Sequence, residues 1–148
     1  MRLALFVPAI VRGGVGWGYG VCRYFANSVS KSAGYCFTEE SKNSRALLML
    51  CEVALGEPDK RTNAHMIDPK ALGKKGLNSV HGVGIREPRP SEARKLDRSV
   101  AVPSGTLQPR DKADPYTSAA WLQYDEFIVY NVAQQRPRFL VEVDIQYK

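Results

Sequence analysis

Ser28, Ser32 and Tyr35 have types and a spacing suited to binding a ligand. Residues 28–36 are predicted to form a short helix with Asn27 or Ser28 as its N-cap. The i, i+4, i+7 spacing would place the two hydroxyls and the aromatic ring on one side of that helix. This side is suited to form one wall of a ligand site, although Tyr35 is also explained by packing in a core.

Glu126 heads a second stretch of interest. Residues 126–132 are rich in β-branched and aromatic side chains and are predicted to form a strand. A lone glutamate at the start of a strand is most often a surface charge, so position alone assigns it no chemistry. His65 and His81 are too few and too isolated to indicate a metal site, and no spacing supports a Ser-His-Asp triad.

The elements that would position these residues are mainly strands. Residues 138–147 alternate between apolar and polar types, which predicts a half-buried strand joined to the preceding one by residues 134–137. Its apolar face would hold Phe139, Val141, Val143, Ile145 and Tyr147. Residues 45–55 form a continuous apolar run that favours a central strand buried on both faces, with a helix as the alternative.

The middle of the chain, residues 57–120, is predicted to be rich in loops because it holds seven of the nine prolines. Short strands are expected at 79–83 and 99–102. Residues 13–20 hold glycine at alternate positions, which predicts a loop rather than a dinucleotide-binding fingerprint. The apolar run 3–11 is explained by a buried strand, an unrelated leader or a short signal-peptide core.

The composition restricts the class of protein. With 148 residues the chain is one domain or part of one, and 44% hydrophobic residues are too many for a disordered tail. The net charge of +6 comes from residues 60–112, where 12 Lys or Arg face five acids. That excess fits either solvated loops or a polyanionic partner.

Cysteine usage bears on the compartment. Cys22, Cys36 and Cys51 are odd in number and form no CxxC motif. They favour neither a disulfide framework nor a cysteine-rich zinc site, and a reducing compartment is expected.

The run from Tyr124 to Gln134 resembles the C-terminal signature of the poly(ADP-ribose) polymerase family. In that signature a glutamate precedes an apolar strand that ends in Tyr and is followed by an Ala-Gln pair. Four further stretches resemble parts of the family sequence and follow one another in the family's order. They are residues 24–26 with 29–36, then 52–56, 79–84 and 102–105. The resemblance spans Gly16 to Lys148, leaves residues 1–15 as an unmatched leader, and is closest to the DNA-damage-responsive branch.

The resemblance implies a fold and a reaction. The fold would be α+β with a mostly antiparallel sheet, the C-terminal part of an incomplete ADP-ribosyltransferase fold. The reaction would be the transfer of ADP-ribose from NAD+ to protein acceptors with polymer extension, without a metal. The resemblance also implies a nuclear location. The charge of the basic stretch 60–112 makes DNA or poly(ADP-ribose) its candidate partner, and no membrane association is expected.

The same resemblance implies roles for five residues. Glu126 would bond the ribose 2′-hydroxyl and favour the cationic transition state, and Lys31 would sit near the reacting sugar and acceptor. Tyr35 would stack on the nicotinamide ring, Ser32 would bond its carboxamide, and Tyr24 would line the opposite side of the pocket.

The sequence departs from the family pattern in two places. The family has a His-Gly motif upstream of the glycine loop, whereas the first histidine here is His65. Tyr19 stands where the family has lysine, and Cys22 and Arg23 are extra residues that leave the strand parity of Tyr24 unchanged. These departures imply either a truncated transferase or an inactive relative that acts as a binding module.

Overall fold

A computed structural model describes residues 2–8 by their backbone and residues 22–36, 38–39, 44–63, 65, 67–97 and 99–146 in full. Strands predominate and pair mostly in antiparallel fashion, so the predicted α+β class with a mostly antiparallel sheet is confirmed. The glycine-rich stretch 13–20 lies outside the described residues. In the described part of the chain, no helix is long and apolar enough to cross a membrane.

The strands form three sheets. The five-stranded sheet has the order β12-β3-β1-β8-β7, made by Gln135–Asp144, Arg45–Ala54, Arg2–Pro8, Ala101–Val102 and Arg94–Lys95. The four-stranded sheet has the order β2-β11-β5-β4, made by Arg23–Phe25, Glu126–Val129, Ser79–Gly82 and Pro58–Arg61. The three-stranded sheet has the order β10-β6-β9, made by Leu122–Tyr124, Gly84–Pro88 and Leu107–Pro109.

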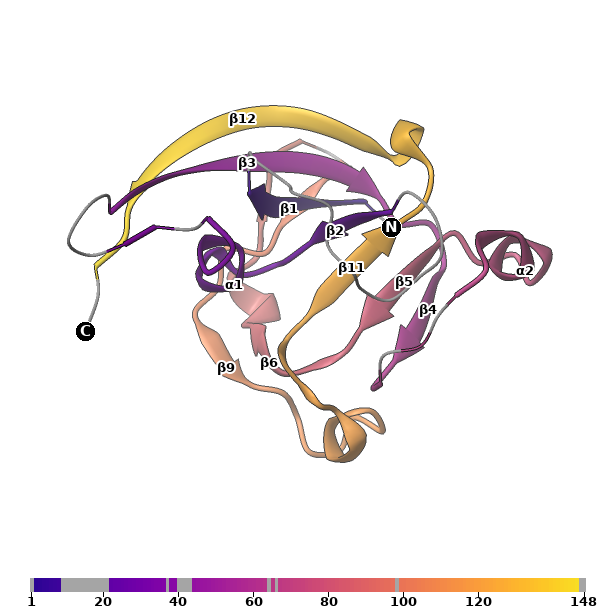
Figure 1. Ribbon diagram of the computed structural model, residues 1–148. Coiled ribbons are helices and arrows are strands. Elements are labelled where there is room, and N and C mark those ends of the chain that lie inside the picture. Colours follow the sequence, from indigo (N-terminus) through magenta and orange to yellow (C-terminus); the bar gives the residue numbers. More distant parts are fainter. Residues whose placement is uncertain are drawn as a thin grey trace.

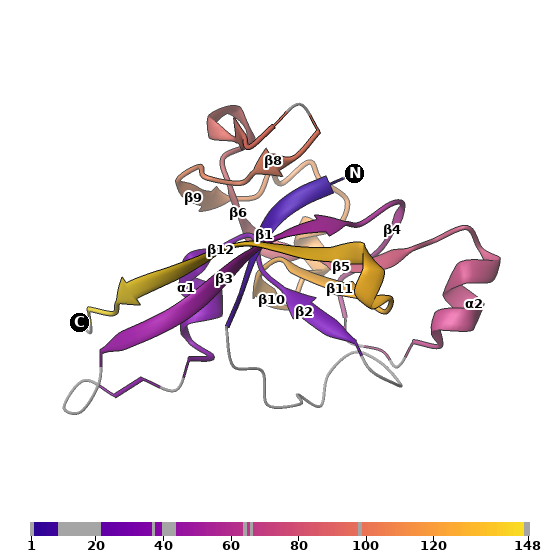
Figure 2. The same ribbon diagram turned by 90° about the horizontal axis from the view of Figure 1, so that it is seen from above.

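Helices are short. The two α-helices are α1 (Val29–Ala33) and α2 (Pro69–Lys74), and the 3₁₀ turns are η1 (Pro90–Glu92), η2 (Thr117–Ala119) and η3 (Val132–Gln134). Figure 1 shows β12 and β3 arching over the four-stranded sheet, with α1 and α2 on opposite sides of the molecule. The same separation of the two helices is visible from above in Figure 2.

The four-stranded sheet is packed on both faces, and β11 supplies both cores. Phe127 and Val129 join a cluster with Phe25 and with Cys51, Val53 and Leu55 of the β3 region. Ile128 points to the other face and joins Val80 with Ile67 and Leu72, the last from α2. The side chains of β11 are divided between the two cores because successive side chains of a strand point to opposite faces. Glu126 therefore lies on the same face as Ile128.

The predicted strand at 45–55 is confirmed, but its burial on both faces is wrong. Ala46 and Leu48 are buried while Leu47 is exposed, so the first half of β3 buries one face only. In the second half Cys51 and Val53 are buried, on the opposite parity. A long twisted strand that arches over a second sheet presents different faces to the core along its length.

The alternation predicted for the last strand is confirmed in part. Val141 and Val143 are half-buried, but Phe139 is exposed. The pairing with β3 shifts at Arg138, which is the extra residue of a bulge, and Phe139 lies beside it where β3 changes its buried face. Residues 135–137, predicted as a connection, belong to β12, and Tyr147 lies outside the described residues.

The other predicted elements are also found. Residues 2–8 form β1, as in the strand alternative for the apolar N-terminal run, and pair with β3 in antiparallel register. The short strands expected near 79–83 and 99–102 are β5 and β8. The helix predicted at 28–36 is present but shorter: it is α1, and Ser28 is its N-cap residue. Tyr35 lies past its end, so the single side predicted to hold Ser28, Ser32 and Tyr35 does not form.

Candidate active site around Glu126

Glu126 lies at the start of β11, between β2 and β5 in the four-stranded sheet. Its register partner in β5 is Gly82, which has no side chain to place beside the carboxylate. The Glu126 side chain is only 13% exposed, so it is not the solvated surface charge that its sequence position alone would favour. The sheet therefore holds a carboxylate in a largely buried position.

Lys31 is the ionic partner of Glu126. Its Nζ lies 2.7 Å from Glu126 Oε1 and donates a hydrogen bond of 3.2 Å to the carbonyl oxygen of Tyr124. The Lys31 side chain is 12% exposed, and it comes from α1, which follows β2 in the chain. A charge-assisted contact of this length is among the stronger polar contacts in a protein, so Lys31 fixes one carboxylate oxygen.

The second carboxylate oxygen has a different environment. Glu126 Oε2 is buried and has no hydrogen-bond partner among the described residues. A buried acceptor without a partner costs free energy, which a hydroxyl donor from a ligand would recover. The arrangement suits a carboxylate that accepts a hydrogen bond from a bound molecule.

Tyr24 lies on the same face of the sheet as Glu126. It pairs with Ile128 in the register of β2 against β11. Burial raises the pKa of Tyr24 well above its usual value, with further contributions from nearby Cys22 and from the negative charge of Glu126. The Tyr24 hydroxyl is buried and has no hydrogen-bond partner among the described residues. Tyr24 is thus a neutral hydroxyl near the carboxylate.

Ser32 and Tyr35 have contrasting environments. Ser32 is buried at 2% exposure, and its carbonyl oxygen accepts from the backbone N–H of Tyr35 at 3.2 Å and from Cys36 Sγ at 3.6 Å. Tyr35 is 56% exposed, so its ring does not pack in the core. Their contacts to nicotinamide stay predictions, whereas Lys31 and Glu126 are brought into direct contact.

Asp125 is an important residue of this region that sequence reasoning missed. It is only 2% exposed, and its carboxylate accepts hydrogen bonds from Asn27 Nδ2 at 2.8 Å and from the Gly84 N–H at 2.8 Å. Arg110 Nη2 donates to both of its oxygens, at 2.8 and 2.9 Å. His81 Nε2 lies 3.3 Å from Asp125 Oδ1, and the His81 ring stacks on Phe127. In the sequence, the only indication of a role for Asp125 was its position directly before Glu126.

The charge state of Asp125 follows from these contacts. Burial disfavours the ionised carboxylate, but the contacts with His81, the Gly84 N–H and Arg110 outweigh burial and hold the pKa of Asp125 below its usual value. Asp125 is therefore ionised at neutral pH inside the protein.

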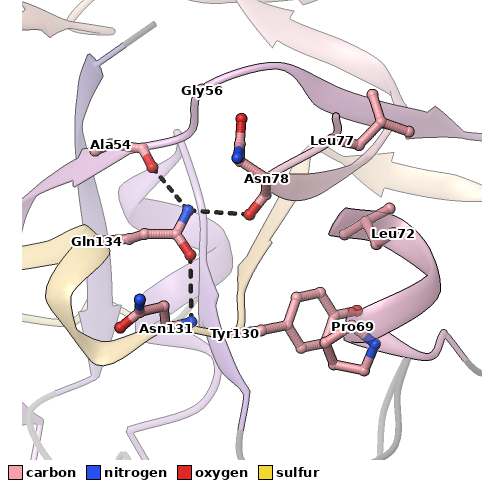
Figure 3. A pocket seen from close by; sticks show the side chains of 9 residues that line it. All are labelled: Ala54, Gly56, Pro69, Leu72, Leu77, Asn78, Tyr130, Asn131 and Gln134. Carbon is pink, nitrogen blue, oxygen red and sulfur yellow. Dashed lines mark hydrogen bonds between the residues drawn. The ribbon is translucent and has the colours of Figure 1, made fainter. Parts of the chain in front are cut away.

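A pocket lies at the opposite end of β11 from Glu126. Figure 3 shows Tyr130, Asn131 and Gln134 on its wall. The Gln134 amide donates to the carbonyl oxygens of Ala54 at 2.9 Å and Asn78 at 3.0 Å. Tyr130 lies four positions after Glu126, about 13 Å along an extended chain, so this pocket is not the Glu126 site. Through these bonds Gln134, at the end of η3, is joined to the end of β3 and to the residue before β5.

In the part of the chain that the structure describes, no group of three or more His, Cys, Asp or Glu side chains is placed to hold a metal ion.

Comparison with known proteins identifies relatives of the whole region. The family model described as "Poly(ADP-ribose) polymerase catalytic domain" matches residues 4–145. That range starts inside the 1–15 stretch, and the boundary between residues 15 and 16 stays a prediction. The chain is 43% identical over 133 residues to "Poly [ADP-ribose] polymerase 2-A" of Oryza sativa subsp. japonica, which covers 90% of the chain and 19% of that protein.

Two further relatives are similar over the same region. The chain is 39% identical over 137 residues to "Poly [ADP-ribose] polymerase 2" of Arabidopsis thaliana, covering 90% of the chain and 20% of the relative. It is 38% identical over 138 residues to "Poly [ADP-ribose] polymerase 2" of Homo sapiens, covering 89% of the chain and 22% of the relative. The chain thus spans about a fifth of the length of these relatives.

Proposed function

Because the chain belongs to the poly(ADP-ribose) polymerase catalytic domain family, we propose that it takes part in the transfer of ADP-ribose from NAD+ to protein acceptors, with Glu126 as its catalytic carboxylate. The observation that carries the proposal is the state of the two Glu126 oxygens. Oε1 is held by Lys31, and Oε2 is buried without a partner among the described residues.

The proposed chemistry follows from that arrangement. Loss of nicotinamide leaves positive charge on the ribose, and a carboxylate held beside it favours the transition state over the neutral ground state. Oε2 accepts the hydrogen bond of the ribose 2′-hydroxyl. Because Lys31 holds the other oxygen of the same carboxylate, Glu126 keeps its orientation when the sugar reacts.

The remaining family residues have supporting roles in the proposal. Ser32 bonds the carboxamide, the exposed ring of Tyr35 stacks on nicotinamide, and Tyr24 lines the side of the site near Glu126. The exposure of Tyr35 and the proximity of Tyr24 to Glu126 are consistent with these roles. Polymer extension and a nuclear location are further proposals that rest on the family alone.

The basic stretch 60–112 supports a second candidate function, binding of DNA or poly(ADP-ribose) by a catalytically inactive chain. Lys70, Lys74 and Lys75 are exposed on and after α2. Arg110 belongs instead to the interior, where it faces acidic side chains. The cations of the stretch that are exposed in the described residues are Lys60, Lys70, Lys74, Lys75, Arg89, Arg94, Lys95 and Lys112. Those available to a polyanion therefore lie on both sides of α2 as well as on it.

Labelled NAD+ separates the two functions. The soluble, folded chain is incubated with it, and label is followed into protein. Incorporation supports the transferase. Absence of incorporation together with absence of NAD+ binding by calorimetry contradicts it, and salt-sensitive binding of a polyanion by that same sample supports the binding module.

A further inference from the structure

We propose that Arg110 and Asp125 form a positioning pair, which sets the direction of the Glu126 carboxylate by holding the residue before it on the opposite side of the strand. The consequence for transfer rests on the function proposed above. The geometric consequence, the placement of Glu126 against Lys31, does not.

Side chains alternate between the two faces of a strand. Asp125 and Glu126 are consecutive, so their side chains leave the backbone on opposite faces. Asp125 shares the face of Phe127, whose partner in β5 is His81 and whose partner in β2 is Phe25. Two residues from the Phe25–Phe127 pair, past the end of β2 and just before β11, Asn27 donates to Asp125 across the same face at 2.8 Å. Fixing the Asp125 side chain therefore fixes the rotation of the backbone that carries Glu126.

Arg110 contributes to that fixation through several contacts. Its Nη2 contacts both oxygens of Asp125, at 2.8 and 2.9 Å, and its Nε donates to the carbonyl oxygen of Gly84 at 3.0 Å. Its Nη1 lies 2.6 Å from Glu87 Oε2 and 3.5 Å from Asp114 Oδ2. With its side chain only 10% exposed, Arg110 ties the start of β11 to β6 of the three-stranded sheet.

Gly84 brings the two sheets into contact at the same point. Its N–H donates to Asp125 Oδ1 at 2.8 Å while its carbonyl accepts from Arg110. A Cβ at Gly84 would collide with the backbone of Tyr124, so only glycine allows this approach. The backbone on the N-terminal side of Glu126 is thus enclosed by Gly84, Arg110 and Asn27.

The contacts of Lys31 depend on how the backbone around Asp125 is placed. Its two acceptors are the Tyr124 carbonyl oxygen and Glu126 Oε1, which come from the residues on either side of Asp125. A rotation of the backbone at Asp125 would displace both acceptors at once. Loss of the Arg110–Asp125 contact should therefore release the Lys31 amine, even with the rest of the fold intact.

The test compares Arg110→Gln, Arg110→Lys, Asp125→Asn and the neutral double variant Arg110→Gln/Asp125→Asn with the unmodified chain. Arg138→Gln is the control because it removes an ion pair, Arg138 to Glu52 at 2.7 Å, in the five-stranded sheet. Each folded protein is treated with an amine-reactive acetylating reagent, and the labelling rate of Lys31 is measured by peptide mass spectrometry. Exposed Lys74 serves as an internal reference.

Several-fold faster labelling of Lys31 relative to Lys74 is expected in Arg110→Gln, with partial rescue in Arg110→Lys and no change in Arg138→Gln. If the transferase is active, kcat should fall on the order of 100-fold with a small change in KM, as for a misplaced catalytic group. The double variant removes both charges together and so leaves neither charge of the pair without its partner. It therefore allows the placement of Glu126 against Lys31 to be tested if a single variant fails to fold. Unchanged Lys31 labelling in the folded double variant overturns the proposal. Changed labelling in a chain without transfer activity overturns only the proposed function.

Discussion

Lys31 Nζ lies 2.7 Å from Glu126 Oε1, and this contact joins the short helix α1 to the first residue of β11. Both side chains are largely buried, at 12% and 13% exposure. The pair therefore combines two roles: it holds α1 against the sheet, and it leaves Glu126 Oε2 as the acceptor for a substrate.

Lys31→Met should weaken both the fold and the transfer reaction. The substitution keeps an unbranched side chain but leaves the buried Glu126 carboxylate without its cation, which should cost roughly 1–3 kcal/mol of unfolding free energy. Chemical denaturation measures the loss. Lys74→Met, at an exposed position of α2, is the matched control and should change stability by less than about 0.5 kcal/mol. Equal effects of the two substitutions would show that the Lys31 contact does not form.

Asp125 should make stability sensitive to acid. Its pKa is lowered in the folded protein, so its contribution is fully present above the pKa of the unfolded chain, about 3.9, and is lost as pH falls through the lower folded value. The unfolding free energy of the unmodified chain should therefore fall more steeply below about pH 4 than that of Asp125→Asn. Urea denaturation at a series of pH values measures both slopes, and parallel slopes would contradict the assignment.

Neighbouring leucines of β3 should differ in their contribution to stability. Leu48 is fully buried and Leu47 is 46% exposed. Leu48→Ala should cost about 2–5 kcal/mol because it leaves a cavity, whereas Leu47→Ala should cost well under about 1 kcal/mol. Thermal or chemical unfolding of the two variants compares them directly. Similar losses would mean that β3 is buried on both faces, as the sequence pattern alone predicts.

The sequence was most informative where a single strand period or a family motif decides the structure. β3 could be predicted because a continuous apolar run ends there at a turn signal, and β11 because β-branched and aromatic residues follow Glu126. The direct contact of Lys31 with Glu126 was not predicted, because residues from α1 and β11 meet through sheet topology and not through spacing. The family resemblance implied only that each residue would lie near the reacting sugar.

Other features depend on contacts that no local pattern encodes. The bulge at Arg138 follows from pairing with β3 and an ion pair with Glu52, so regular alternation misplaced Phe139. Arg110 looked like one more cation of a basic stretch, yet it lies in the interior because Asp125, Glu87 and Asp114 converge on it. Counting charges along the sequence cannot distinguish an exposed cation from one enclosed by carboxylates.

The most direct test of the account is the transfer of label from NAD+ to protein by the unmodified chain, by Glu126→Gln and by Glu142→Gln. Glutamine keeps the shape of Glu126 but removes the charge that should stabilise the cationic sugar, whereas Glu142 pairs with Arg45 at an exposed site of β12. We expect incorporation by the unmodified chain and by Glu142→Gln, with a loss on the order of 100-fold or more in Glu126→Gln. Incorporation by folded Glu126→Gln at the rate of the unmodified chain would contradict it.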